Sequence, residues 1–389
     1  RAYWPDGSVK WTLHSAIASG EMFFLKEAGM ERVMPRECRD DKIRFGEMEL
    51  DFSEKTGVPR IRYGRETRGG RLIARISGEE YVGYQESIEI EDMGAVRMVI
   101  KITGAHLGPN GQRVLPFILR YYVYQGDPQI RLVHTWLHDL DPFTQQVDAL
   151  GIEFRTPIQG PIYNRHVRIA GDTGYLKESC VLLNSWRPRL PREWYSAQIA
   201  GEMLSLNPDQ HPEAFQAMNN MTWWDSWKIV QDSSEHYRIQ KGTGEKDCSF
   251  VDGPEGRRSG GYLYAAGLGV GLKDFWQKYP SGLEAEGLAQ ERTLCTVWFY
   301  SPEAKAMDFR HYSTKSYQMT CYEGFPEVGA SAYGIGVTSE CSVRLTDEVP
   351  SDEEMEAFGA RIQKPAVYVG TPEYYHEKRA LGYWSLKKE

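Results

Sequence analysis

Most of the chain alternates between apolar and polar residues, which is the pattern of half-buried β-strands. Met98, Ile100 and Ile102 occupy every second position of one such segment, and residues 130–138 repeat this period. Successive side chains of a strand point to opposite faces of its sheet, so each segment predicts a long strand with one buried face.

Turn-forming residues separate these segments. Residues 108–111 (GPNG) and 125–128 (QGDP) are each flanked by apolar runs, as connections between antiparallel neighbours require. Similar signals recur at residues 252–254 and 279–282. No repeat of about 20–50 residues indicates a propeller or a solenoid. We therefore predict an all-β fold, with one large antiparallel β-sandwich over residues 86–350.

One short helix is predicted near the C-terminus. Ser351 and Glu354 have the spacing of a capping box, in which each side chain bonds to the backbone amide of the other residue. A helix over residues 352–362 should follow and end before Pro365, which lacks a backbone donor. Residues 366–370 then have the composition of a short strand.

Three regions are expected along the chain. Composition changes between about residues 55 and 85, where glycines interrupt charged segments. We predict that residues 1–85 are the remnant of a small, incomplete N-terminal β-barrel and that residues 86–350 are the sandwich. Residues 351–389 should form a helix and a linker toward a further domain. At roughly 150 residues per domain, a chain of 389 residues suggests two or three modules.

Composition argues against two classes of partner. No apolar run approaches the ~20 residues that cross a bilayer, so we expect no membrane span. The net charge is −8 without a basic tract, so the long-range field repels nucleic acid. Six Cys are too few for a disulfide scaffold, and we predict that Cys180, Cys295 and Cys341 are free core thiols. The chain begins at Arg1 without a signal-peptide pattern, which leaves its compartment open.

Seven sequence blocks resemble the exo-rhamnogalacturonan lyase family, polysaccharide lyase family twenty-six, and its bacterial relatives. The first block is WPDGSVKW at residues 4–11. The others cover residues 129–136, 165–168, 275–280, 298–304, 310–312 and 372–375. Each block is short, and their order across the whole chain makes the match specific.

The resemblance implies a small N-terminal barrel, a central β-sandwich and a C-terminal α/α toroid. This chain would contain the remains of the barrel, the whole sandwich and the approach to the toroid. Because the family's cleft lies between sandwich and toroid, some functional residues would lie outside the 389 residues. The implied partner is an acidic polysaccharide or oligosaccharide of the rhamnogalacturonan type, cleaved by β-elimination. The oligomeric state stays open.

A uronate lyase removes the C5 proton of the sugar and expels the glycosidic oxygen from C4. The site must neutralise the neighbouring carboxylate and hold a base within hydrogen-bond reach. Arg suits the carboxylate because its planar fork binds both oxygens, while Lys, Tyr or His suits the base. No cofactor or metal motif is present in the sequence, although Ca²⁺ could also neutralise a carboxylate.

Lys241 is the first catalytic candidate. The segment 236–243 (HYRIQKGT) resembles a family block of the form Phe-x-Ile-x-Lys-Arg-Thr, in which Lys241 and Thr243 match and Gly242 replaces the Arg. A base at this position should lie in a groove beside a Tyr, Arg or His and have a lowered pKa. The alternative is a solvated Lys on a surface strand.

Arg310, His311 and Tyr312 form the second candidate group, because one tripeptide holds all three residue types. On a strand, Arg310 and Tyr312 would point to one side and His311 to the other. We assign His311 and Tyr312 as catalytic candidates and Arg310 as a substrate-binding one. The alternative is a sandwich strand with a packed Tyr and an ion-paired Arg.

Five further residues are candidates for holding the sugar. Aromatic rings can cover the apolar face of a sugar, and Trp224 and Trp227 lie among polar residues. Tyr322 and Tyr333 stand beside glycines, where a backbone can approach a ligand. Arg258 offers a guanidinium to an anionic sugar. The alternative for the two Trp residues is core packing, that for the two Tyr residues is a bend in the chain, and that for Arg258 is a solvated loop.

Two other function classes stay open beside the lyase. One is a carbohydrate-binding module without chemistry of its own. The other is a glycoside hydrolase that uses two carboxylates, because the sequence holds 54 Asp and Glu whose positions in space it does not reveal. His134 and His138 lie about 13 Å apart along a strand, too far for one zinc ion, and we predict core or rim histidines.

Overall fold

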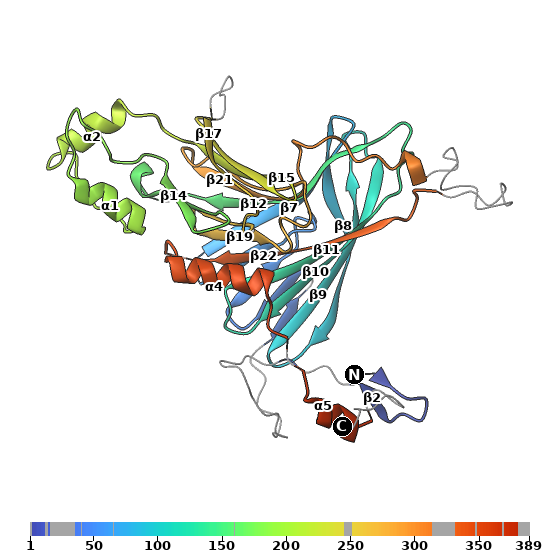
Figure 1. Cartoon of the computed structure of the whole chain (residues 1–389). Helices are drawn as coiled ribbons and strands as arrows, with labels where there is room; N and C mark the ends of the chain where they lie inside the picture. The colour runs from blue at the N-terminus through green and yellow to red at the C-terminus, as the bar shows by residue number, and fades with distance from the viewer. Residues whose placement is uncertain are drawn as a thin grey trace, which may run out of the picture.

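Antiparallel β-strands dominate the computed structural model of the chain (Figure 1). The structure describes residues 2–11, 15, 36–39, 41–64, 66–158, 160–244, 251–312, 331–346, 348–367 and 369–379. Hydrogen bonds join most of the strands into one continuous sheet. Its order is β17 (Val251–Gly256), β16 (His236–Gly242), β15 (Ser226–Ser233), β20 (Ser281–Glu286), β21 (Arg292–Tyr300), β12 (Val147–Pro157), β7 (Glu66–Ile76), β8 (Glu79–Met93), β9 (Arg97–Leu107), β10 (Arg113–Tyr124), β11 (Gln129–Leu137), β22 (Gly336–Leu345), β19 (Leu268–Leu272), β18 (Tyr262–Ala265), β13 (His166–Ala170) and β14 (Tyr175–Ser179).

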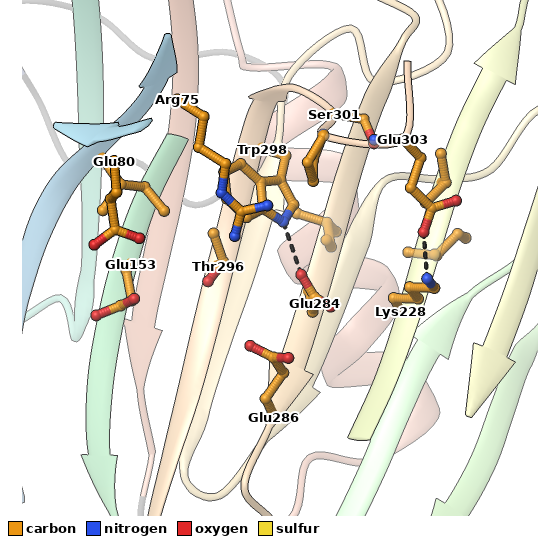
Figure 2. A pocket seen from close by; sticks show the side chains of 15 residues that line it. Arg75, Glu80, Glu153, Lys228, Glu284, Glu286, Thr296, Trp298, Ser301 and Glu303 are labelled. Carbon is orange, nitrogen blue, oxygen red and sulfur yellow. Dashed lines mark hydrogen bonds and ion pairs between the residues drawn. The ribbon is translucent and has the colours of Figure 1, made fainter. Parts of the chain in front are cut away.

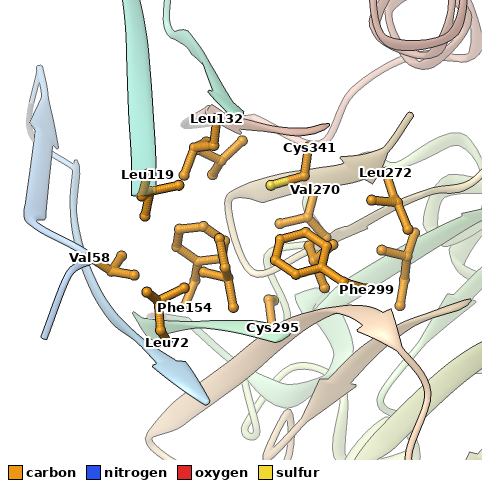
Figure 3. Packing of buried hydrophobic residues seen from close by; sticks show 14 of the residues in the cluster. Val58, Leu72, Leu119, Leu132, Phe154, Val270, Leu272, Cys295, Phe299 and Cys341 are labelled. Carbon is orange, nitrogen blue, oxygen red and sulfur yellow. The ribbon is translucent and has the colours of Figure 1, made fainter. Parts of the chain in front are cut away.

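This sheet folds back on itself and encloses the main core. Leu72 of β7 and Phe154 of β12 face Leu119 of β10 and Leu132 of β11 across the interior (Figure 3). All four side chains are almost completely buried. Burial of this kind stabilises a fold by about 1.5–3 kcal/mol for each large apolar side chain. The predicted β-sandwich is therefore confirmed.

The alternation in the sequence corresponds to the two faces of the strands. Met98, Ile100 and Ile102 of β9 are fully buried, and the residues of β11 alternate in the same way. The predicted turn at residues 108–111 joins β9 to β10, and the turn at 125–128 joins β10 to β11. Both pairs are antiparallel, as predicted.

A smaller ladder precedes the large sheet. The strands β3 (Arg36–Arg39), β4 (Lys42–Phe45), β5 (Met48–Asp51) and β6 (Arg60–Tyr63) pair in sequence, and β6 pairs with the start of β7. The strands β1 (Ala2–Tyr3) and β2 (Val9–Trp11) pair only with each other among the described residues. Because β7 and β8 also belong to the large sheet, that sheet begins before residue 86, where the sequence placed its start.

Helices lie at the ends and edges of the sandwich. The predicted helix is α4 (Asp352–Gln363), and the capping box between Ser351 and Glu354 is present. Its residues Met355 and Phe358 pack against Tyr262 of β18. The short strand predicted at residues 366–370 is absent from the four of these residues that are described, because no neighbouring strand pairs with them.

Three other α-helices occur among the described residues and are not predicted by the sequence. They are α1 (Arg192–Ala200) and α2 (Pro212–Asn219), which follow β14 in the sequence and lie at the left of the molecule in Figure 1, and α5 (Pro372–Glu377). Neither α1 nor α2 begins with a capping side chain, so the usual start signal is missing. Among the described helices, none has both the length and the apolar character needed to span a bilayer.

The predicted core cysteines and histidines are confirmed. Cys180, Cys295 and Cys341 are free and buried. His134 and His138 are also buried, and the ring of His134 stacks on Phe299 at 5.0 Å between ring centroids.

Candidate functional site

A hollow of about 340 Å³ opens on the outer face of the strands β8, β7, β12, β21, β20 and β15 (Figure 2). This volume lies at the lower end of the range of small-molecule sites, which is about 300–1,000 Å³. The polar and aromatic residues of its lining that matter below are Arg75, Glu80, Glu153, Lys228, Glu284, Glu286, Trp298 and Glu303.

Strand register brings these side chains together. Glu153 on β12 lies opposite Thr296 on β21, Thr296 lies opposite Glu284 on β20, and Glu284 lies opposite Lys228 on β15. The adjacent residues on the same strands point into the core, as Phe154 does beside Glu153 and Cys295 does beside Thr296. One face of the same strands therefore builds the sandwich, and the other face carries a row of polar groups.

Trp298 forms the floor of the hollow. Gly151 and Gly282 lie directly opposite it on the two neighbouring strands. A Cβ atom at Gly151 would stand 3.0 Å from Cε3 of the indole, and one at Gly282 would stand 3.4 Å from Cδ1. The indole Nε1 donates a hydrogen bond of 2.9 Å to Oε2 of Glu284. The two glycines thus leave room for the ring between the strands.

Two of the carboxylates in the hollow are neutralised by cations. Glu153 accepts hydrogen bonds of 2.8 and 3.0 Å from Nε and Nη2 of Arg71. Glu303 forms ion pairs with Lys228 and Arg238. Burial opposes ionisation of Glu303, but hydrogen bonds and charge from Lys228 and Arg238 outweigh it, so its pKa is lowered.

The pKa values of Glu284 and Glu286 are raised, in contrast to the lowered pKa of Glu303. Burial raises the pKa of Glu284, although the hydrogen bond from Trp298 and the charge of Lys228 oppose this. Burial raises the pKa of Glu286 to about 7, and the charge of Glu284 adds to the effect. Both carboxyl groups on this strand therefore have raised pKa values, and Glu286 titrates near neutral pH.

Arg75 is the cation of the hollow whose charge is least compensated. Its side chain is exposed, and its Cζ atom lies 5.4 Å from the centroid of the Trp298 ring. Within the described part of the chain, its guanidinium makes no hydrogen bond or ion pair with a carboxylate. The arrangement therefore offers a guanidinium to an anion beside two carboxyl groups that can exchange protons.

Lys241, the first catalytic candidate from the sequence, lies elsewhere. Its Nζ atom lies 3.1 Å from Oε1 of Glu178 on β14 and 4.4 Å from the ring centroid of Trp224. Lys241 is partly buried, so it is not a solvated surface residue. The structure brings together two candidates here, Lys241 and Trp224, and it holds them with a carboxylate rather than with a Tyr, an Arg or a His.

The second candidate group has a different backbone from the one predicted. Residues Arg310–Tyr312 form the short 3-10 helix η2, so strand alternation does not apply to them. Arg310 is exposed and pairs with Asp308 at 2.7 Å, and the rings of His311 and Tyr312 lie 4.0 Å apart. This group is separate from the hollow, because none of its residues contributes to the lining.

The remaining candidates are dispersed. Trp227 is fully buried in the core, because it points inward from β15, so its assignment to sugar binding is wrong. Arg258 lies over the ring of Trp276 at 4.2 Å and pairs with Glu235. Tyr333 is exposed. Tyr322 lies outside the described residues. The catalytic and binding roles of the other candidates stay predictions.

Sequence reasoning missed the residues of the hollow, although one signal was available. On β20, Glu284 and Glu286 alternate with buried apolar residues, and on β7 Arg71 and Arg75 do the same. Such charges on an otherwise apolar strand mark a polar face. Within the described ranges, no group of three or more His, Cys, Asp and Glu side chains could hold a metal ion.

Comparisons with known proteins identify relatives of the chain. The family model described as the PcRGLX-like protein central beta sandwich domain matches residues 62–360, and that of the PcRGLX-like N-terminal RIFT barrel domain matches residues 1–27. The curated protein YetA of Bacillus subtilis (strain 168), described as uncharacterized, is 37% identical over 419 aligned residues, which cover 99% of this chain and 48% of YetA. The chain thus spans about half the length of that relative.

Among solved structures, one from Escherichia coli K12 is described as a putative aldose 1-epimerase. It matches 79% of this chain and 98% of its own chain, with 12% identity and a TM-score of 0.30. The family resemblance found in the sequence blocks is confirmed by the two family models.

Proposed function

The chain belongs to the PcRGLX-like family, and we propose that its hollow binds an acidic saccharide of the rhamnogalacturonan type, which the protein cleaves by β-elimination. The observation that carries the proposal is the exposed guanidinium of Arg75 in a small-molecule-sized hollow. The family motifs support the substrate class, and the side chains of the hollow support the chemistry.

Arg75 supplies the first requirement of the reaction. A uronate resists loss of its C5 proton because the adjacent carboxylate is already negative, and an arginine paired with both carboxylate oxygens removes much of that charge. Glu153 and Glu303 already have cationic partners, so they compete little for Arg75.

Trp298 supplies an apolar surface for a sugar ring. The indole packs against Gly151 and Gly282, and its hydrogen bond to Glu284 holds the ring in place. Its exposed fraction is only 5%, because Arg75 lies over the ring. In the proposed complex, Arg75 turns toward the carboxylate of the sugar and uncovers part of the indole, on which the ring then packs.

Glycoside hydrolysis is the second candidate reaction. The specific observation in its favour is the presence of two carboxyl groups with raised pKa values, Glu284 and Glu286, in one hollow. A pair of carboxyl groups is what most glycoside hydrolases use. The two reactions leave different products, since elimination leaves an unsaturated uronate and hydrolysis leaves a saturated one.

Incubation of the full-length protein with rhamnogalacturonan oligosaccharides tests the proposal. We expect ultraviolet absorbance from an unsaturated uronate, and we expect Arg75→Ala to lower kcat/KM by about 10- to 100-fold, since a hydrogen bond to a charged group contributes about 1.5–3 kcal/mol. Arg60→Ala is the matched control, because Arg60 pairs with Glu54 on the smaller ladder. Saturated products would favour the hydrolase, and equal rates for both variants would contradict the role of Arg75.

A further inference from the structure

We infer that Glu286 is the proton acceptor and Glu284 the proton donor of the reaction in the hollow. This inference rests on the proposed function and deepens it, because it assigns the acid and the base to carboxyl groups of the sandwich. It is an alternative to the prediction from the sequence, in which the base is a Lys, a Tyr or a His.

The first support is the position of the two groups. Glu284 and Glu286 are two residues apart on β20, with Ala285 between them facing the core, so both carboxyl groups are on the hollow side. Figure 2 shows the carboxyl group of Glu286 extending toward Glu284, below the indole of Trp298. Both carboxyl groups therefore face the hollow.

The second support is that the two groups are held differently. Oε2 of Glu284 accepts the hydrogen bond from Nε1 of Trp298, which fixes that carboxyl group and leaves Oε1 to carry a proton. Glu286 also lines the hollow but is exposed, so it can exchange protons with solvent. A fixed donor and an accessible acceptor are the arrangement that general acid–base catalysis needs.

The third support is that the other two carboxylates discussed above, Glu153 and Glu303, are engaged in ion pairs. Glu153 is paired with Arg71, and Glu303 is paired with Lys228 and Arg238. Both groups thus already have cationic partners, and Lys228 and Arg238 lower the pKa of Glu303. The raised pKa values of Glu284 and Glu286 agree with this division, because a base that titrates near the working pH transfers protons most effectively.

The step balances without a further reactant. The C5–H bond breaks and its proton goes to the carboxylate of Glu286, while the electron pair of that bond forms the C4=C5 double bond. The C4–O bond breaks, and the departing oxygen takes the proton of Glu284. Glu286 then loses its proton to solvent, and Glu284 regains one. Arg75, which carries the substrate carboxylate, lies close enough to affect the charge of both groups.

Two isosteric variants test the assignment. We expect Glu286→Gln to lower the rate of unsaturated product formation by about 100- to 10,000-fold, the usual contribution of a positioned proton-transfer group, and to abolish the rise in rate with pH near 7. Glu284→Gln should lower the rate by a similar factor, because it removes the proton that the departing oxygen takes. The matched control is Glu89→Gln, which removes one carboxylate from β8 outside the hollow.

Binding is measured separately, by calorimetric titration of each variant with a rhamnogalacturonan oligosaccharide. We expect the dissociation constant of Glu286→Gln to be within a fewfold of the wild-type value. The variant cannot accept the proton, but its side chain keeps the same size and its contacts with the sugar. Binding by the wild type without unsaturated product would overturn the acid–base assignment and leave the binding function standing. A Glu286→Gln rate equal to that of Glu89→Gln would also overturn it. If the wild type does not bind, the proposed function fails and the assignment fails with it.

Discussion

Replacement of Gly151 by Ala should destabilise the protein and disturb the floor of the hollow. A Cβ atom at this position would stand 2.6 Å from the carbonyl oxygen of Val297 and 3.0 Å from Cε3 of Trp298. The first contact is with backbone, so a side-chain rotation does not relieve it. Because Gly151 is in the middle of β12, between β7 and β21, its strand must move or the indole must rise into the hollow.

The magnitude follows from one stabilising effect and two destabilising ones. Alanine in the middle of a strand is better than glycine by roughly 0.5–1 kcal/mol. Overpacking costs about 1–3 kcal/mol, and loss of the hydrogen bond between Trp298 and Glu284 costs a further ~1 kcal/mol. We therefore expect Gly151→Ala to lower the free energy of unfolding by about 1–3 kcal/mol and to weaken saccharide binding as the indole shifts.

Gly69→Ala is the matched control. Gly69 lies on β7, and a Cβ atom there would meet nothing within 4 Å. Urea unfolding followed by circular dichroism should show a lower midpoint for Gly151→Ala and an equal or slightly higher midpoint for Gly69→Ala, with unchanged slopes. Equal midpoints for the two variants would refute the steric argument and the position of the indole that it depends on.

Two further perturbations test other parts of the structure. Burial lowers the pKa of His134 to about 3 and that of His106 to about 4, below the unfolded value of about 6.5. The unfolded chain therefore binds more protons, so stability should fall as pH decreases from about 6.5 toward 4, and His134→Leu should flatten this dependence in urea unfolding. Lys241→Ala should lower stability by about 1.5–3 kcal/mol, because it leaves Glu178 partly buried without its cation. A loss of rate at unchanged stability would instead support Lys241 as the catalytic base.

The main features of the fold could be predicted because they depend on local periodicity. Alternation along β9 and β11 gave the buried faces, and the turns between neighbours gave the antiparallel pairing. The capping box of Ser351 gave the start of α4. The helices α1 and α2 lack such a start signal, and η2 occupies a segment whose composition also suits a strand.

The candidate site could not be predicted because it depends on strand order. Glu153 and Glu284 are separated by 131 positions in the numbering, and they come close only because β21 pairs with both of their strands. The family resemblance directed attention to Lys241 and to residues 310–312, which are close to family motifs in sequence. The hollow instead combines residues from six strands, and only the pairing of those strands reveals it.

The contribution of Arg75 to binding of a uronate is the most direct test of the central claim. Calorimetry would compare a rhamnogalacturonan oligosaccharide with the same oligosaccharide after reduction of its carboxyl groups to alcohols. We predict that the wild type binds the acidic ligand about 10- to 100-fold more tightly than the reduced one, and that Arg75→Ala binds the two ligands equally. Equal affinities in the wild type, or the same preference in Arg75→Ala, would contradict the account.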